Sequence, residues 1–354
     1  MCQTPAGTLG EVMKYNPALD GLRAVAVFLV LGFHARIEGF GGGFLGVDMF
    51  FVLSGYLITC LLAEQYAATG GIDVRAFYLR RLRRLYPALL LLLAVHLIVS
   101  PLMFPEHKHH ARDALVAASY LSDYGFAFWK VPWVLQHTWS LSVEEHFYLA
   151  WPLVMLLILR LPRRASVMTV LGLALAATLW RWHVVFNVDA WHQPYFRFDT
   201  RLSGLLLGSA AALWKPRLPR LSGLVGAALL LAALSQAVVK EDPALTIWMA
   251  AGEAGSLLLV LGAAQVPLLA SWPLIWIGKL SYGIYLWHFP IMLWLRGQEI
   301  TGWTSMLIGT CGSVACAAVS YSTVERLSRA RKANHVEAEA QEQLGARRIN
   351  PRIS

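Results

Sequence analysis

The sequence predicts an all-α polytopic membrane protein, with about ten transmembrane helices around a polar cavity. Of its 354 residues, 57% are hydrophobic and 14% are charged, and the mean hydropathy is +0.53. Soluble domains carry about 25% charged residues. Apolar segments long enough to cross a bilayer recur along the chain. Clusters of Lys and Arg lie at every second junction between them, as the positive-inside rule predicts for cytoplasmic loops.

Ten apolar segments follow one another between two polar tails, 1–14 and 328–354. We expect the spans at 16–35, 44–63, 86–104, 138–159, 166–185, 199–214, 221–239, 245–266, 274–295 and 303–321. Segments 64–86 and 105–137 are expected to be loops. The first span is read as retained and not as a cleaved signal, because Arg23 and His34 bracket it and no small-residue cleavage site follows.

The basic clusters fix the expected orientation. They follow spans 2, 4, 6 and 10, so they all fall on one side, which becomes the cytoplasmic side. An even number of spans then places both tails in the cytoplasm, and we expect a multi-pass protein of the bacterial inner membrane. The formal net charge of +9 does not indicate a nucleic-acid partner, because the basic residues are confined to junctions between apolar spans.

Titratable groups inside apolar spans are costly and are therefore candidates for function. Arg23 and His34 are eleven positions apart, about three helical turns, so they share one helix face. Their axial separation is about 16 Å, half the hydrocarbon thickness. The predicted orientation puts Arg23 near the cytoplasm and His34 near the outer surface.

Further polar residues are expected in the outer half of the bundle, in a solvated cavity between helices. They are Asp48, Glu144, Glu145, His146, Asp199, Arg201 and His288. A structural role is the alternative for each of them. The carboxylates would then hold polar helix junctions, Asp199 would pair with Arg201, and His288 would bond backbone groups freed by Pro290.

The cysteines and the loop histidines predict no special chemistry. The four Cys residues form no disulfide framework and are read as structural or free thiols. His107, His109 and His110 lie close together in sequence, but no second ligand group follows at close spacing. We therefore expect no metal.

Six sequence motifs in order resemble the acyltransferase 3 family, membrane-bound enzymes that O-acylate sugars and other extracytoplasmic acceptors. They are LDGLRAVAV with the following His34, GGFLGVDMFFVLSGYLIT, FYLRRLRRLYP, TWSLSVEEHFYL, SYGIYLWHFP and the closing Val324-Glu325-Arg326. The resemblance covers residues 15–327, which we take as the acyltransferase domain. Leu327 stands where the family usually has a proline.

The resemblance implies transfer of an acyl group, usually acetyl, from cytoplasmic acyl-CoA to a hydroxyl of an extracytoplasmic carbohydrate such as a polysaccharide or O-antigen. Arg23 and His34 match the family's essential motif, and Arg81 and Arg84 match its two-arginine motif. Because the arginine fork suits phosphate, Arg23, Arg80, Arg81 and Arg84 are the candidate acyl-CoA contacts.

Histidine is the residue type whose unperturbed pKa suits a general base near neutral pH, so we expect His34 to deprotonate the acceptor hydroxyl; an acyl-histidine intermediate is the alternative. Asp48 or Glu145 would orient the imidazole. The candidate acceptor contacts are Glu144, Asp199, Arg201 and His288. Alternative functions are acylation of a small molecule or a lipid, a multi-span transporter, or a binding protein without catalysis.

Overall fold

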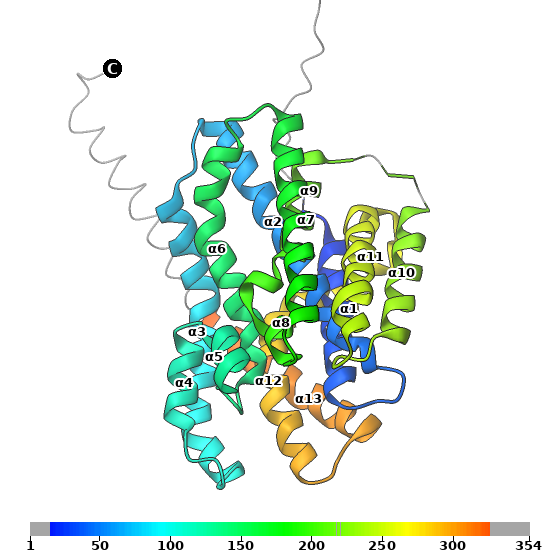
Figure 1. Ribbon diagram of the computed structural model, residues 1–354. Coiled ribbons are helices and arrows are strands. Elements are labelled where there is room, and N and C mark those ends of the chain that lie inside the picture. The colour runs from blue at the N-terminus through cyan, green and yellow to red at the C-terminus, as the bar shows by residue number, and fades with distance from the viewer. Residues whose placement is uncertain (1–14, 217, 220, 326–354) are drawn as a thin grey trace, which may run out of the picture.

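The computed structural model describes residues 15–216, 218–219 and 221–325, and within these ranges it contains helices and no strands (Figure 1). The longer helices are α1 (Pro17–His34), α2 (Leu45–Thr69), α3 (Val74–Met103), α6 (Trp139–Ile158), α7 (Arg163–Asn187), α9 (Leu202–Trp214), α10 (Ser222–Gln236), α11 (Met249–Gly262), α12 (Trp272–Gly297) and α13 (Gly302–Ser320). The shorter ones are α4 (His110–Ala118), α5 (Ser122–Trp129) and α8 (His192–Phe196). The two tails predicted at 1–14 and 328–354 lie outside the described residues.

Seven helical segments of the described chain are long and apolar enough to cross a membrane. They are Pro17–His34, Gly41–Thr69, Val74–Met103, Gln136–Ile158, Arg163–Asn187, Ala244–Gln265 and Gly302–Thr323. Each coincides with a predicted span, which confirms an all-α polytopic membrane protein. The number of ten crossings stays a prediction.

The other three predicted spans are also helical, but they differ from ordinary spans. Helices α9 and α10 have 13 and 15 residues, so α9 is about 20 Å long, less than the roughly 30 Å of hydrocarbon. Helix α12 has 26 residues and carries Lys279, His288 and Arg296. Helices α9 and α12 are largely buried, whereas α10 exposes most of its side chains and buries only Gly223, Gly226, Leu230 and Ala233.

The arginine-rich segment predicted as a loop at 64–86 is helical instead. Helix α2 continues to Thr69 and ends at Gly70, whose φ of 74° is left-handed. Helix α3 begins at Val74, where the side chain of Asp73 accepts a hydrogen bond from the Ala76 amide. The cap and the leucines between the arginines favour a helix here. The arginines therefore have fixed directions on α3.

The segment 105–137, also predicted as a loop, contains α4 and α5 and ends in a 3₁₀ turn at Gln136–Thr138. These helices lie at the same end of the bundle as the connection between α12 and α13 (Figure 1). Asp113 and Asp123 are fully buried there. Asp113 accepts a hydrogen bond from the Trp133 amide, and Asp123 lies 3.2 Å from His146 Nδ1, so buried polar contacts replace the polar and aromatic loop expected from the sequence.

Helices α1 and α12 approach each other unusually closely. A Cβ added to Gly278 of α12 would lie 1.9 Å from the carbonyl oxygen of Asp20 in α1. Only glycine permits this contact, because no side chain fits between the two backbones. The close packing brings the polar side chains of α1 directly against α12.

Candidate active site

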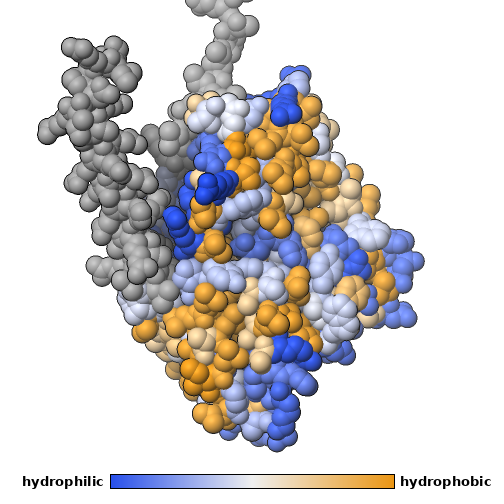
Figure 2. All heavy atoms as spheres, turned by 90° about the vertical axis from the view of Figure 1, so that its left-hand side faces the viewer, coloured by the Kyte–Doolittle hydropathy of each residue, from blue (hydrophilic) through white to orange (hydrophobic). Residues whose placement is uncertain are grey.

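Four basic side chains line one cavity: Arg23 of α1, Arg81 and Arg84 of α3, and Lys279 of α12. This basic cavity holds about 730 Å³ of space not occupied by atoms, part of it open to solvent. Arg81 and Arg84 are three positions apart and so share a face of α3. On the side of the molecule that carries α3, hydrophilic surface interrupts the apolar surface at mid-height (Figure 2). Such a concentration of cations suits an anionic ligand.

Glu144 is the acidic side chain among the residues that line the basic cavity. Its carboxylate accepts a hydrogen bond of 2.5 Å from the Ser54 hydroxyl. Arg81 lies beside it, with the guanidinium carbon 4.6 Å from the centre of the Tyr148 ring. One carboxylate among four basic groups leaves the cavity with a net positive charge.

Three histidines from different helical segments meet beyond the inner end of this cavity. The ring centre of His34 lies 5.2 Å from that of His288, and His288 lies 5.5 Å from His137. Phe289 packs against both His34 and His137, at 5.0 and 5.2 Å. Arg296 of α12 donates a 2.9 Å hydrogen bond to the main-chain oxygen of His34. We call His34, His137 and His288 the histidine cluster.

Main-chain carbonyls fix the ring nitrogens of two of these histidines. His288 Nδ1 lies 2.6 Å from the Tyr285 oxygen, and His137 Nε2 lies 3.0 Å from the Leu286 oxygen. A carbonyl only accepts, so each of these nitrogens must carry a hydrogen. His288 Nε2 and His137 Nδ1 are buried without a hydrogen-bond partner. In the neutral rings both are lone-pair acceptors, ready for a hydroxyl donor.

Tyr285 connects the basic cavity to the histidine cluster. Its ring lines the cavity and lies 5.2 Å from His288. Its hydroxyl is bonded to Ser140 at 2.6 Å and donates to the main-chain oxygen of His137 at 3.0 Å. His34 itself does not line the basic cavity, since Tyr285 and His288 stand between. Arg23 and His34 nevertheless both face α12, as their spacing predicts.

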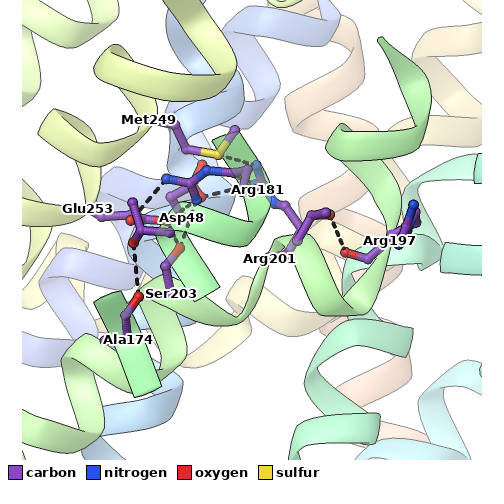
Figure 3. A network of polar contacts seen from close by, with 10 residues as sticks. Asp48, Ala174, Arg181, Arg197, Arg201, Ser203, Met249 and Glu253 are labelled. Atoms are coloured by element: carbon purple, nitrogen blue, oxygen red, sulfur yellow. Dashed lines mark hydrogen bonds and ion pairs between the residues drawn. The ribbon is translucent and has the colours of Figure 1, made fainter. Parts of the chain in front are cut away.

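The predicted carboxylate partners of His34 lie elsewhere. Asp48 pairs with Arg201 at 3.0 Å, inside a buried network with Arg181 and Glu253 (Figure 3). Glu253 accepts from Arg181 and from Ser203, at 2.7 and 2.6 Å. Within the described chain, neither Asp48 nor Glu145 is hydrogen-bonded to His34. Asp48 thus takes the alternative role of joining helices.

The remaining predicted site residues are also separated from the histidine cluster. Glu145 lines a neighbouring groove between α3 and α6. Asp199 pairs with Arg197 and accepts from Trp180 at 2.6 Å, so its expected pairing with Arg201 is wrong. Arg80 is exposed and does not line the basic cavity. Of the predicted acceptor contacts, the structure brings only His288 to His34.

Several site residues were not singled out from the sequence. His137 directly precedes Thr138, the first residue of the TWSLSVEE motif, and no apolar periodicity marks it. Lys279, Tyr282 and Tyr285 could have been found by helical spacing, because they recur every three positions toward His288 on one face of α12. Among the described residues, no group of three or more His, Cys, Asp or Glu side chains is placed to hold a metal ion.

These features define a polytopic membrane protein with a basic cavity that leads inward to a buried histidine cluster. The chain belongs to the acyltransferase family whose model, described as an acyltransferase domain, matches residues 16–324. The resemblance seen in the sequence motifs is thereby confirmed.

Named relatives add detail about the family. The chain is 36% identical over 315 residues to the peptidoglycan O-acetyltransferase OatA of Listeria monocytogenes, covering 79% of this chain and 50% of the relative. It is 35% identical over 321 residues to the O-acetyltransferase OatA of Staphylococcus aureus, covering 82% and 52%. The chain thus spans about half the length of these relatives. No solved structure matches it.

Proposed function

We propose that the protein is a membrane-bound O-acyltransferase that moves an acetyl group from cytoplasmic acyl-CoA to a hydroxyl of a cell-wall carbohydrate, such as a peptidoglycan glycan. The names of the relatives support acetyl transfer and this class of acceptor. The observation that carries the proposal is the joining of the basic cavity to the histidine cluster through α1 and α12.

The basic cavity is the proposed donor site. Coenzyme A carries phosphates, and guanidinium and ammonium groups bind phosphate strongly in a partly desolvated site. Arg23, Arg81, Arg84 and Lys279 would hold these phosphates, while the pantetheine arm points along α12 toward Tyr285. Arg80 of α3 is exposed and does not line the basic cavity, so it would contribute only to the general positive field.

The histidine cluster is the proposed reaction centre. His34 takes the proton of the acceptor hydroxyl while that oxygen attacks the thioester carbonyl, and the carbon–sulfur bond breaks. The proton then passes to the departing thiolate, so the products are an ester and free coenzyme A. His288 Nε2 and His137 Nδ1 accept hydrogen bonds that orient the acceptor. In the alternative, the His34 ring first attacks the thioester and releases coenzyme A, and the acceptor hydroxyl then attacks the acyl-His34 intermediate to form the ester.

Tyr285 would have to move for the thioester to reach His34. Its ring and hydroxyl close the inner end of the basic cavity, held by Ser140 and by the His137 main chain. This closure would keep water away from the thioester until the acceptor is bound.

In this proposal the acyltransferase domain is 15–327, and the tails 1–14 and 328–354 are cytoplasmic. The bacterial inner membrane is the proposed location, with the basic junctions inside. The histidine cluster then lies toward the outer surface, where a carbohydrate acceptor is found.

The test compares cells that express the wild-type protein, His34→Ala or the control His183→Ala, a histidine exposed on α7. Mass spectrometry of envelope glycans should show one added acetyl mass per modified sugar with the wild type and the control, and none with His34→Ala at equal expression. Wild-type acetylation by His34→Ala would contradict the mechanism. Acylation of a small molecule or a lipid without change in the glycans would favour that acceptor class, and uptake independent of acyl-CoA would favour a transporter.

A further inference from the structure

A second pocket lies at the C-terminal end of α12, away from the basic cavity and, in the proposed orientation, toward the outer surface. Its walls come from the end of α3 and the segment after it, from the segment before α6, and from the last turns of α12. The lining residues are Met103, Phe104, Pro105, Glu106, His107, Trp133, Trp294, Gly297 and Gln298. It holds about 800 Å³ of unoccupied space and is open to solvent. We call it the outer pocket.

Two indole rings dominate this pocket and remain accessible. Trp133 is 43% exposed and Trp294 is 36% exposed. The exposed side chains of Glu106 and Gln298 and the partly buried ring of His107 line the same pocket. Flat apolar faces beside hydrogen-bonding groups match the two chemistries of a sugar ring, its C–H face and its hydroxyls.

The position of Trp133 is fixed by a buried charge. The main-chain nitrogen of Trp133 donates a 2.7 Å hydrogen bond to Asp113 Oδ2. The same oxygen lies 2.9 Å from His107 Nε2, and the Asp113 carboxylate is fully buried. The Trp133 ring then packs on His107 at 5.4 Å and on Phe104 at 5.7 Å. A buried carboxylate therefore holds two walls of the outer pocket at once.

The outer pocket is close to the histidine cluster along α12. Trp294 is six residues beyond His288, about 9 Å along the helix axis. Arg296, between Trp294 and Gln298 in sequence, donates to the main-chain oxygen of His34. A chain of sugars bound at the pocket would thus have a neighbouring unit within reach of the three histidines.

We propose that the outer pocket is a saccharide-binding subsite for the acceptor glycan, with one sugar ring packed on Trp133 and Trp294 and its hydroxyls bonded to Glu106, His107 and Gln298. This inference depends on the proposed function for the identity of the glycan. Tryptophans also occur in the aromatic belts of membrane proteins, but a belt residue needs no buried carboxylate to hold its main chain.

The direct test uses the full chain in lipid nanodiscs and the β-1,4-linked tetramer of N-acetylglucosamine as the probe. Saturation-transfer NMR should detect binding to the wild type, and Trp133→Ala or Trp294→Ala should weaken it about tenfold or more. Trp303→Ala removes an indole that is 71% exposed and lies outside the pocket, so it should bind like the wild type. Absence of binding to the wild type, equal binding by the pocket variants, or equal loss in Trp303→Ala would overturn the subsite.

Asp113 is the proposed positioning residue, and its role is tested by kinetics. Asp113→Ala frees both Trp133 and His107, so the KM for the acceptor should rise while the KM for acyl-CoA stays unchanged. Asp113→Asn keeps an acceptor oxygen and should restore most of the acceptor affinity. A fall in kcat for both variants without any change in acceptor KM would assign Asp113 a purely structural role and contradict the proposal.

The two proposals can fail separately. Saccharide binding that depends on Trp133, in a protein that transfers no acetyl group, would keep the outer pocket and refute the acyltransferase reaction. Acetyl transfer to glycan that is indifferent to Trp133 and Trp294 would keep the reaction and refute the subsite.

Discussion

At the scale of single residues, hydrogen-bond partners decide which polar groups are available for chemistry. His288 and His137 each give one ring nitrogen to a main-chain oxygen and keep the other free and buried. Asp48, equally buried, has its oxygens bonded to Arg201. The histidines can therefore receive a substrate hydroxyl, whereas Asp48 cannot do so without breaking an ion pair.

The arginines of α3 provide a test at this scale, because only some of them line the basic cavity. Arg84→Ala would remove one of the proposed phosphate contacts and should raise the KM for acetyl-CoA about tenfold or more, as expected for one charge-assisted hydrogen bond. Arg80→Ala, four positions earlier and outside the cavity, is the matched control and should change KM little. The measurement is initial-rate kinetics with labelled acetyl-CoA, and equal effects of the two variants would refute the assignment of the donor site.

At the scale of helices, buried ion pairs join elements that hydrophobic packing alone would leave free to slide. Arg181 of α7 bonds Glu253 of α11, and Arg201 before α9 bonds Asp48 of α2 (Figure 3). Arg201 also lies over the ring of Trp139, with its guanidinium carbon 5.2 Å from the ring centre. These contacts join α2, α6, α7, α11 and the start of α9.

Replacing one member of a buried ion pair in this network should lower the free energy of unfolding more than replacing both members. Arg181→Met leaves Glu253 buried and uncompensated, which should destabilise the fold by about 3–5 kcal/mol, whereas Arg181→Met with Glu253→Leu should recover most of that loss. Arg164→Met, on the exposed start of α7, should be close to neutral. Thermal unfolding in detergent measures all three. A double variant no more stable than Arg181→Met would show that the ion pair is not the cause.

At the scale of the whole molecule, the proposed orientation in the membrane would give the two pockets different partners. The basic cavity and the outer pocket lie at different heights along α12, because Trp294 of the outer pocket is fifteen residues beyond Lys279 of the basic cavity, about 22 Å along the helix axis. Acyl-CoA and a cell-wall glycan occur on opposite sides of the membrane, so this separation suits the proposed reaction.

The predicted orientation can be tested with single cysteines in a variant that lacks the native ones. Lys108→Cys, on the exposed segment beside the outer pocket, should react with a membrane-impermeant maleimide in intact cells. Lys215→Cys, at the end of α9, should react only after the cells are permeabilised. Both positions are exposed in the structure, which makes them matched probes. The reverse labelling pattern would invert the topology and remove cytoplasmic acyl-CoA as the donor.

The sequence by itself determined that the protein is an all-α membrane protein of the acyltransferase family, and it predicted a candidate site along α1. Hydropathy and charge placement are local properties, and the cost of charge in hydrocarbon makes them decisive for a membrane bundle. Helical periodicity likewise placed Arg23 and His34 on one face, and the two-arginine motif placed Arg81 and Arg84 together.

Only the tertiary structure decided which polar groups meet. Asp48 bonds Arg201, 153 positions away, and His137 bonds the main chain of Leu286, 149 positions away. No periodicity within one helix can specify such partners, because they depend on how different helices rotate and pack. The same reason explains why Arg80 lies outside the basic cavity, why Tyr285 closes it, and why Asp113 holds the walls of the outer pocket.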